Sequence, residues 1–127
     1  MDITFLTLAQ VLQLHRSSIE KYGGDPSVRD IGLLESAIAQ PMASFGGAYL
    51  HSDLPAMAAA YLFHIVSNHP FVDGSRRTGA FAAFVFLELN DLPLTAPEKE
   101  FEKITLAVAN GKASKDEVIE FFYTHTG

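Results

Sequence analysis

Hydrophobic residues recur along the chain mostly at the three- and four-residue spacing of amphipathic helices, and two central segments are almost wholly apolar. Capping residues, glycines and prolines separate these segments from one another. None of the segments shows the strict alternation of apolar and polar residues that is typical of a half-buried strand. The pattern predicts helices from the Thr7 cap to Gly23 and over residues 31–40, 54–68, 75–90, 98–109 and 115–123. The expected fold class is all-α, a compact bundle of about six helices.

Local signals place the helix ends. A hydroxyl or carboxylate at the N-cap accepts hydrogen bonds from free backbone N–H groups, and proline is tolerated in the first turn. Such signals are the capping pairs Thr7/Gln10 and Ser114/Glu117, the N-cap residues Asp30 and Asp53, and Pro55. Residues 41–53 contain glycines and aromatics without a helical period, so a loop or a weak hairpin is expected. This segment is either a surface that docks another chain or a plain connection.

Composition narrows the class of protein. The chain has 127 residues, which predicts a single domain over residues 1–127 with its own core. The net charge of −6 argues against direct nucleic-acid binding, which depends on cations that face phosphates. Cysteine is absent from the sequence, which excludes a disulfide framework and thiolate metal sites and favours a cytoplasmic location. The sequence shows neither a signal peptide nor an apolar run that predicts a membrane span.

Two histidines fall inside predicted helices, and both are expected to be structural. His15, next to Arg16, is expected on a partly exposed polar face of the first helix. His64 lies in the apolar helix 54–68, where a core histidine with satisfied hydrogen bonds is a better explanation than a ligand. The apolar side chains of helix 75–90 are expected in the core.

The candidate chemistry concentrates in residues 68–78, Asn-His-Pro-Phe-Val-Asp-Gly-Ser-Arg-Arg-Thr, between the two most apolar helices. Charged groups in such a place need partners or a ligand. The His69 imidazole can accept a proton near neutral pH, or it can complete the end of the preceding helix by binding a free carbonyl. Phe71 is expected to point into the core and to anchor the loop.

The second half of this loop has the features of a phosphate site. Asp73 can bind Mg²⁺ while phosphates supply further oxygens, or it can cap the next helix. Gly74 and Ser75 enter a helix N-terminus, whose free N–H groups and dipole favour an anion. Arg76 and Arg77 place two cations at this positive helix end, which an anion would stabilise; a surface ion pair is the alternative. Together these residues suit the transfer of a phosphate-containing group.

At these residues the sequence resembles the Fic/Doc superfamily. The loop of that family runs His-x-Phe-x-Asp/Glu-Gly/Ala-Asn-x-Arg, and the loop here reads His69-Pro-Phe71-Val-Asp73-Gly74-Ser75-Arg76-Arg77. The Doc (death-on-curing) branch, with His-Pro-Phe-x-Asp-Gly-Asn-Lys-Arg-Thr, is similar over the whole loop. Further matches are residues 21–24 (Lys-Tyr-Gly-Gly), 30–37 (Asp-Ile-Gly-Leu-Leu-Glu-Ser-Ala), 45–47 (Phe-Gly-Gly) and 86–90 (Phe-Leu-Glu-Leu-Asn). The resemblance covers essentially the whole chain and implies the all-helical Fic/Doc fold.

The resemblance implies a nucleotide-dependent transferase that modifies a protein hydroxyl. His69 would deprotonate the acceptor Ser, Thr or Tyr, and Asp73 would hold Mg²⁺. Segment 41–53 falls where the family has the flap that docks its target. The phosphates would be bound by Gly74, Ser75, Arg76 and Arg77.

The similarity to the Doc branch further implies a toxin of a toxin–antitoxin pair. Such toxins use ATP to phosphorylate a translation elongation factor of the Tu type, and the antitoxin Phd neutralises them with a C-terminal tail. The expected partners are therefore a Phd-like antitoxin and a translation elongation factor, and the expected cofactors are ATP and Mg²⁺. The chain lacks the family's inhibitory Ser/Thr-x-x-x-Glu-Gly/Asn motif, so inhibition is expected to come from a partner.

Three residues depart from the family patterns. Ser75 replaces the family Asn, and Arg76 replaces the usual Lys of the Doc branch. Ala80 stands where adenylylating Fic enzymes (Gly-Asn-Gly-Arg-x-x-Arg) have a second Arg, and the loss of this phosphate clamp favours phosphate transfer over AMP transfer. The alternatives are AMP transfer to a protein hydroxyl and, because of Ser75, a catalytically weak nucleotide- or anion-binding module.

Overall fold

The computed structural model describes residues 2–127 and confirms an all-α bundle. This part of the chain contains six α-helices, one 3₁₀ helix (η1) and one two-stranded hairpin. The elements are α1 (Leu8–Tyr22), α2 (Ile31–Ala39), η1 (Gln40–Met42), β1 (Ser44–Phe45), β2 (Ala48–Tyr49), α3 (Leu54–Asn68), α4 (Ser75–Leu89), α5 (Glu98–Ala109) and α6 (Lys115–Thr124). Among the described residues, no helix combines the length and the hydropathy that crossing a bilayer would need.

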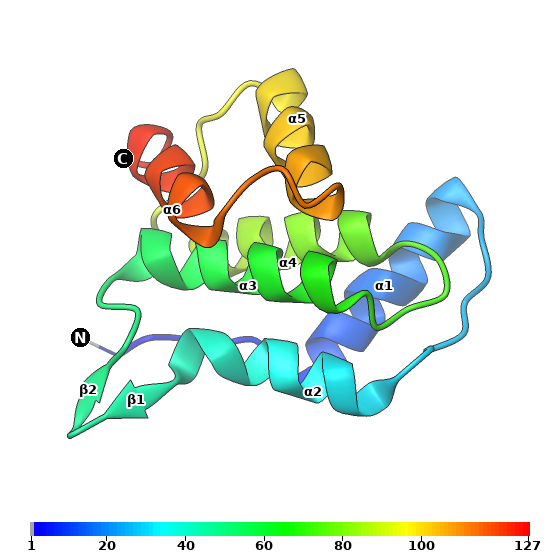
Figure 1. Cartoon of the computed structure of the whole chain (residues 1–127), viewed down its shortest axis with the longest axis horizontal. Helices are drawn as coiled ribbons and strands as arrows, with labels where there is room; N and C mark the ends of the chain where they lie inside the picture. Colours follow the sequence, from blue (N-terminus) through cyan, green and yellow to red (C-terminus); the bar gives the residue numbers. More distant parts are fainter. Residues whose placement is uncertain (1) are drawn as a thin grey trace.

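The helices form layers around α3 and α4, which run antiparallel through the middle of the molecule (Figure 1). α5 and α6 cover one side of this pair, α2 and the hairpin lie on the other side, and α1 packs against α4. α3 contacts α2, η1, α4, α5 and α6, and its Met57, Tyr61 and Ile65 side chains are fully buried. The loop that joins α3 to α4 is therefore held at both ends by the best-packed part of the protein.

Small residues let α3 and α4 approach each other closely. Ala58, Ala59 and Ala60 are fully buried in α3. On the facing side of α4, a Cβ added at Gly79 would lie 2.7 Å from Cγ2 of Val66. A larger residue at this position would push the two helices apart, so the placement of the first turn of α4 depends on this glycine.

The helix ends follow the predicted signals. Both capping boxes form, with the Thr7 and Ser114 hydroxyls each accepting a hydrogen bond from the backbone N–H three residues later. The Asp30 and Asp53 carboxylates cap α2 and α3. Each of these caps satisfies an N–H group that the first helical turn leaves free, so local sequence is sufficient to set the start of these helices.

Other details of the helices differ from the predictions. α2 ends at Ala39 and the chain continues as the tighter turn η1, which accommodates Pro41. α4 ends one residue earlier than predicted, and α6 ends one residue later. The expectation that all apolar side chains of α4 are core is wrong for Phe84 and Leu89, which are 40% and 44% exposed on its uncovered face.

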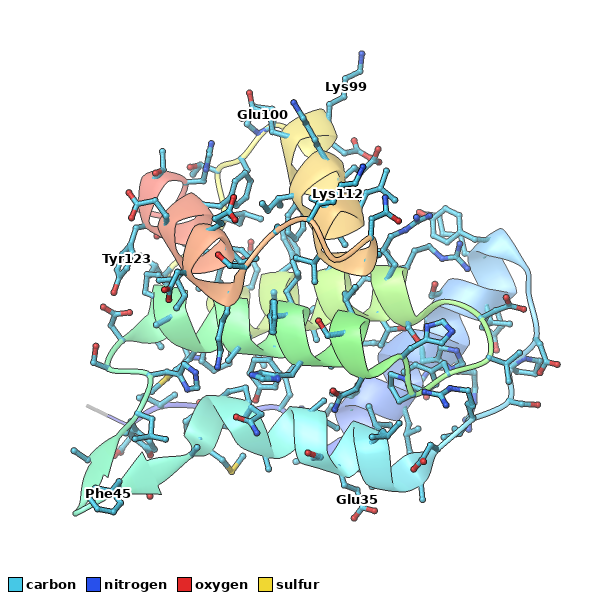
Figure 2. The ribbon with its side chains drawn as sticks, viewed as in Figure 1. Glu35, Phe45, Lys99, Glu100, Lys112 and Tyr123 are labelled. Atoms are coloured by element: carbon cyan, nitrogen blue, oxygen red, sulfur yellow. The ribbon has the colours of Figure 1, made fainter. Side chains whose placement is uncertain are left out.

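Segment 41–53 forms a weak hairpin, which was one of the two expected outcomes. Ser44 pairs with Tyr49 and Phe45 with Ala48. The two-residue turn between the strands has φ values of 60° and 81° at Gly46 and Gly47, and such a turn requires left-handed conformations of this kind. Figure 2 shows Phe45 at the outer end of the hairpin, where its side chain is 82% exposed.

The hairpin lies far from the loop that carries His69. It precedes α3 and the loop follows α3, and the 15 residues of this helix span about 22 Å. None of the residues that line the hollow beside His69 belongs to segment 41–53. A target held against the hairpin would therefore have to extend along the protein to reach His69.

His64 is half-buried in α3, but the prediction that its hydrogen bonds are satisfied is wrong. Its Nε2 atom is buried without a partner among residues 2–127. Desolvation, together with the nearby Lys115 and His51, lowers the pKa of His64 from 6.5 to about 4. The ring is neutral at pH 7 because charging it would place a cation beside a lysine in a poorly hydrated site.

We expect this histidine to make the fold sensitive to acid. The unfolded chain binds a proton at His64 as the pH falls below 6.5, whereas the folded protein does so only near pH 4. The contribution of His64 to the free energy of unfolding is thus fully present above pH 6.5 and is lost between pH 6.5 and about 4. The loss amounts to about 1–2 kcal/mol once solvent screening of this half-buried ring is allowed for. Urea unfolding across this range measures the loss. The His64→Gln variant should show a flatter pH dependence, and an unchanged slope would contradict the assignment.

Candidate functional site

The loop between α3 and α4 borders a hollow of about 770 Å³. The end of α1, the last turn of α3, the first turn of α4 and the end of α5 surround it. The sequence analysis singled out seven site residues, and six of them line this hollow: His69, Asp73, Gly74, Ser75, Arg76 and Arg77. The structure therefore brings one candidate base, one carboxylate, two cations and a helix N-terminus to a single opening.

His69 presents its imidazole to this hollow from an unusual backbone conformation. It is the C-cap residue of α3, with φ 48° and ψ 56°, in the left-handed region that residues other than glycine rarely adopt. Its side chain is exposed, and its ring nitrogens form no hydrogen bond within residues 2–127. The alternative in which the ring caps a carbonyl at the end of α3 is not what the structure shows.

Phe71 lies under the loop and faces away from the hollow. Its ring is fully buried and stacks on the His15 ring, with 3.7 Å between ring centroids and 8° between planes. Its backbone N–H donates to Oγ of Ser75 over 3.1 Å, and the Ser75 hydroxyl also reaches the Phe71 carbonyl over 3.4 Å. These contacts close the loop from beneath, so that the residues on either side of Phe71 face the opening.

The Asp73 carboxylate is exposed beside the hollow and is oriented by a backbone group. Its Oδ2 accepts a hydrogen bond from the Asp25 N–H over 2.8 Å. The N-cap residue of α4 is Gly74, and no side chain caps this helix, so Asp73 does not act as the helix cap. A Cβ at Gly24 would lie 3.0 Å from that of Asp73, which explains why the facing segment carries glycine there.

The free oxygen of this carboxylate suits a hard divalent cation. No group of three or more His, Cys, Asp or Glu side chains within the described chain could hold a metal ion by itself. Asp73 is the one acidic residue among those that line the hollow. Mg²⁺ commonly takes one or two protein carboxylates and completes its octahedron with phosphate and water oxygens. The donor set therefore fits Mg²⁺ that arrives with a nucleotide.

The first turn of α4 supplies anion-binding donors. The Thr78 N–H makes the first hydrogen bond of the helix, to the Gly74 carbonyl over 2.9 Å, so the three preceding N–H groups have no helical partner. The Ser75 side chain is 3% exposed and is engaged with Phe71, so Ser75 can offer an anion its backbone N–H only. Replacement of the family Asn by Ser thus leaves the backbone donors of this turn in place.

The two arginines differ in how they are held. Arg77 donates from Nε to the Ser18 hydroxyl over 2.9 Å and from a terminal nitrogen to the Gly23 carbonyl over 3.3 Å. Its guanidinium also lies 5.1 Å from the centroid of the Tyr22 ring. Arg76 is exposed and borders both the hollow and a neighbouring groove of about 470 Å³. Neither arginine forms an ion pair with residues 2–127, so their charge remains available to an anion.

His15 contributes to the site in a way that the sequence analysis missed. The predicted exposed position is wrong: His15 is 3% exposed, and its Nε2 lies 2.8 Å from the Asp73 carbonyl oxygen, to which it donates. Together with its stacking on Phe71, this bond explains why a polar ring is buried in α1. The spacing of Val11, His15 and Ser18 places all three on one helix face, which is the signal that could have identified it.

A second missed feature is the extended segment 25–30 between α1 and α2. Its residues are all exposed, yet it makes a series of hydrogen bonds with residues 68–73. Arg29 is its main contributor and bonds the carbonyl oxygens at the end of α3. Nothing in the local sequence pattern marks this segment, because its partners lie about 40 residues further along the chain.

Comparisons with known proteins agree with this geometry. The model of the Fic/DOC family matches residues 5–87, which include α1, α2, α3, the loop and all but the last two residues of α4. The chain is 43% identical to Toxin Doc of Mycolicibacterium smegmatis over 75 residues, which are 59% of this chain and 58% of that protein. It is 29% identical to Protein kinase doc of Escherichia phage P1 over 111 residues, which are 87% of this chain and 86% of that protein. Since the family model covers more than half of its length, this chain belongs to the Fic/DOC family.

Proposed function

We propose that this chain is a Doc-type toxin. It transfers the γ-phosphoryl group of ATP to a hydroxyl of a translation elongation factor of the Tu type, and protein synthesis stops. The observation that carries this proposal is that His69, Asp73, the free N–H groups of α4, Arg76 and Arg77 all border one hollow. The names of the two relatives, Toxin Doc and Protein kinase doc, support it.

In this mechanism His69 is the general base. Its free ring nitrogen removes the proton of the acceptor hydroxyl as that oxygen attacks the γ-phosphorus. The new O–P bond forms while the bond between the γ-phosphorus and the β,γ-bridging oxygen breaks, and ADP leaves. His69 carries the abstracted proton until product release returns it to solvent. The left-handed backbone at His69 holds the ring over the hollow rather than along α3.

The other residues bind and neutralise the phosphates. The N–H groups at the start of α4 and the guanidinium of Arg77 donate to phosphate oxygens, and Arg76 adds a second, mobile cation. Asp73 would hold Mg²⁺, which would supply charge neutralisation to the phosphates. Oδ2 of Asp73 already accepts from the Asp25 N–H, so its Oδ1 is the oxygen that remains free for the ion.

Ala80 favours phosphoryl transfer over AMP transfer. This position, where adenylylating relatives carry a second arginine, borders the neighbouring groove together with Glu98 and Glu102. Arg76 and Arg77, which also line the hollow, are the basic residues of this groove, and its lining within residues 2–127 holds no third cation at the place of the missing arginine. The third alternative, a catalytically weak binding module, would keep the same backbone donors of α4, so only the transfer of label from ATP separates it from the proposed transferase.

Expression of the chain in a bacterial host tests the proposed role as a toxin. Growth and incorporation of labelled amino acids should stop when the wild-type chain is induced and continue when a His69→Ala variant is induced at the same level. We propose that a Phd-like antitoxin restores growth when it is expressed together with the chain. Unimpaired growth and translation at confirmed expression of the wild-type chain would argue against a toxin.

Loss of Arg77 should weaken nucleotide binding. Arg77→Ala removes a guanidinium that Ser18 and Gly23 hold in place, and a charge-assisted hydrogen bond contributes about 1.5–3 kcal/mol. The Kd of ATP is therefore expected to rise about 10–100-fold in calorimetry. Arg16→Ala, an exposed arginine of α1 outside the hollow, is the matched control and should leave the Kd unchanged. Equal affinities of the Arg77→Ala variant and the wild type would exclude Arg77 as a phosphate ligand.

A further inference from the structure

We propose that Arg29, which lies outside the hollow, is a positioning residue that holds His69 in its reactive orientation. This inference rests on the proposed function for its catalytic part. Its structural part, the hold on the His69 backbone, can be measured without any activity. No signature motif of the loop contains Arg29, and its role follows from its hydrogen bonds.

Residues 25–30 form a strap that runs antiparallel along residues 68–73. At one end the Asp25 N–H donates to the Asp73 carboxylate over 2.8 Å, and the Val72 N–H donates to the Ser27 carbonyl over 3.1 Å. A single β-bridge joins Val28 to Phe71. The strap therefore contacts the loop almost residue by residue, as one strand of a sheet contacts the next.

At the other end of the strap, Arg29 binds three consecutive carbonyl groups. Its Nε donates to the His69 carbonyl over 2.7 Å, and a terminal nitrogen donates to the Asn68 carbonyl over 2.9 Å. Its backbone N–H donates to the Pro70 carbonyl over 2.7 Å. The carbonyls at the end of α3 have no helical donor and lie at the negative end of the helix dipole, so a guanidinium is well suited to them.

This arrangement fixes the two torsion angles that aim the imidazole. The Asn68 carbonyl belongs to the peptide plane before the His69 Cα, and the His69 carbonyl belongs to the plane after it. One rigid guanidinium holds both planes, and together they define φ and ψ of His69. The left-handed conformation of His69 is unfavourable for a residue with a Cβ, so it needs such a contact to persist.

Arg29 does not serve as a phosphate ligand. It is absent from the lining of the hollow, and its donors face backbone carbonyls on the other side of the loop. The strap is exposed throughout, so its hold on the loop comes from hydrogen bonds and not from burial. Loss of the Arg29 side chain should therefore free His69 without opening the core.

The kinetic test compares Arg29→Ala with Arg77→Ala, two variants that lose the same charge. For Arg29→Ala we expect kcat to fall about 10–100-fold while the Kd of ATP stays within about twofold, because misplacement of a catalytic group slows chemistry without weakening binding. Arg29→Lys should give an intermediate kcat, since an ammonium cannot bond both peptide planes in a fork. Arg16→Ala is the control for charge. An unchanged kcat, or a rise in Kd like that of Arg77→Ala, would overturn the assignment.

A second measurement does not depend on activity. The ¹⁵N relaxation of the His69 and Val72 amides in Arg29→Ala should report increased motion, while the amides of α3 before residue 65 keep their wild-type values. If the wild-type protein transfers no label, the proposed function fails and this measurement alone decides the role of Arg29. Wild-type rigidity of His69 in the folded Arg29→Ala variant would refute the proposal.

Discussion

Replacing His69 by alanine is expected to lower the rate of phosphoryl transfer by a factor of about 10²–10⁴, the usual contribution of a positioned general base. The His69 ring is exposed and forms no hydrogen bond with residues 2–127, so its removal costs the fold little packing. The first-order rate of transfer from saturating ATP to the acceptor protein measures the effect. The Kd of ATP should stay close to the wild-type value, because the proposed phosphate ligands are the N–H groups of α4 and its arginines.

His69→Asn is the matched control for the backbone at this position. Asparagine tolerates the left-handed conformation better than most residues and keeps a polar side chain, but it cannot take up a proton. Both variants should be equally inactive if proton transfer is the function of His69. Full activity in either variant would remove the imidazole from the role of base.

Phe71→Ala is expected to destabilise the protein by about 3–5 kcal/mol, the usual cost of deleting a fully buried phenyl ring. The ring is 0% exposed and stacks on His15, which in turn holds the Asp73 carbonyl. Deleting it therefore leaves a cavity beneath the loop and removes the support of a polar ring. The melting temperature should fall by roughly 10–20 °C in a calorimetric scan.

Phe71→Leu separates packing from stacking. Leucine refills most of the volume, so this variant should lose less stability than Phe71→Ala, while the stacking partner of His15 is still gone. If the free energy of unfolding of Phe71→Ala lies within about 1 kcal/mol of the wild-type value, Phe71 does not anchor the loop.

Most helices could be predicted from the sequence because their signals are local. The Thr7 and Ser114 capping boxes and the Asp53 cap followed by Pro55 each act within one helical turn, and the structure shows all of them. The spacing of apolar residues that predicts the central helices can likewise be read within each segment alone. The hairpin in segment 41–53 could not be chosen over a loop, because two-residue strands carry no alternation.

The supports of the loop could not be predicted, because they come from residues distant in sequence. His15 bonds a carbonyl 58 residues further along the chain, and Arg29 bonds carbonyls 39 and 40 residues away. A polar residue in a helix or an exposed segment gives no local sign of such a partner. The unsatisfied ring of His64 is a similar case, since its surroundings include Lys115 from α6.

The sequence identifies the residues of the loop, but not the role of each side chain. The sequence places base, carboxylate, helix N-terminus and cations within nine positions, and the fold brings all of them to one hollow. The side chain and the backbone of this helix turn then differ in role: the Ser75 side chain closes the loop from beneath, whereas the three N–H groups before Thr78 have no helical partner. The chain can therefore depart from the family Asn and still keep the free backbone donors of the proposed anion site.

The central claim is tested most directly by the transfer of label from ATP to host-lysate proteins, with γ-labelled and α-labelled nucleotide in parallel and His69→Ala as the control. We predict that a single acceptor protein is labelled from the γ position, that purified elongation factor Tu accepts the same label, and that His69→Ala abolishes both signals. Label from the α position would show AMP transfer instead. The absence of label from either position, with ATP still bound in calorimetry, would contradict a transferase and leave a binding module.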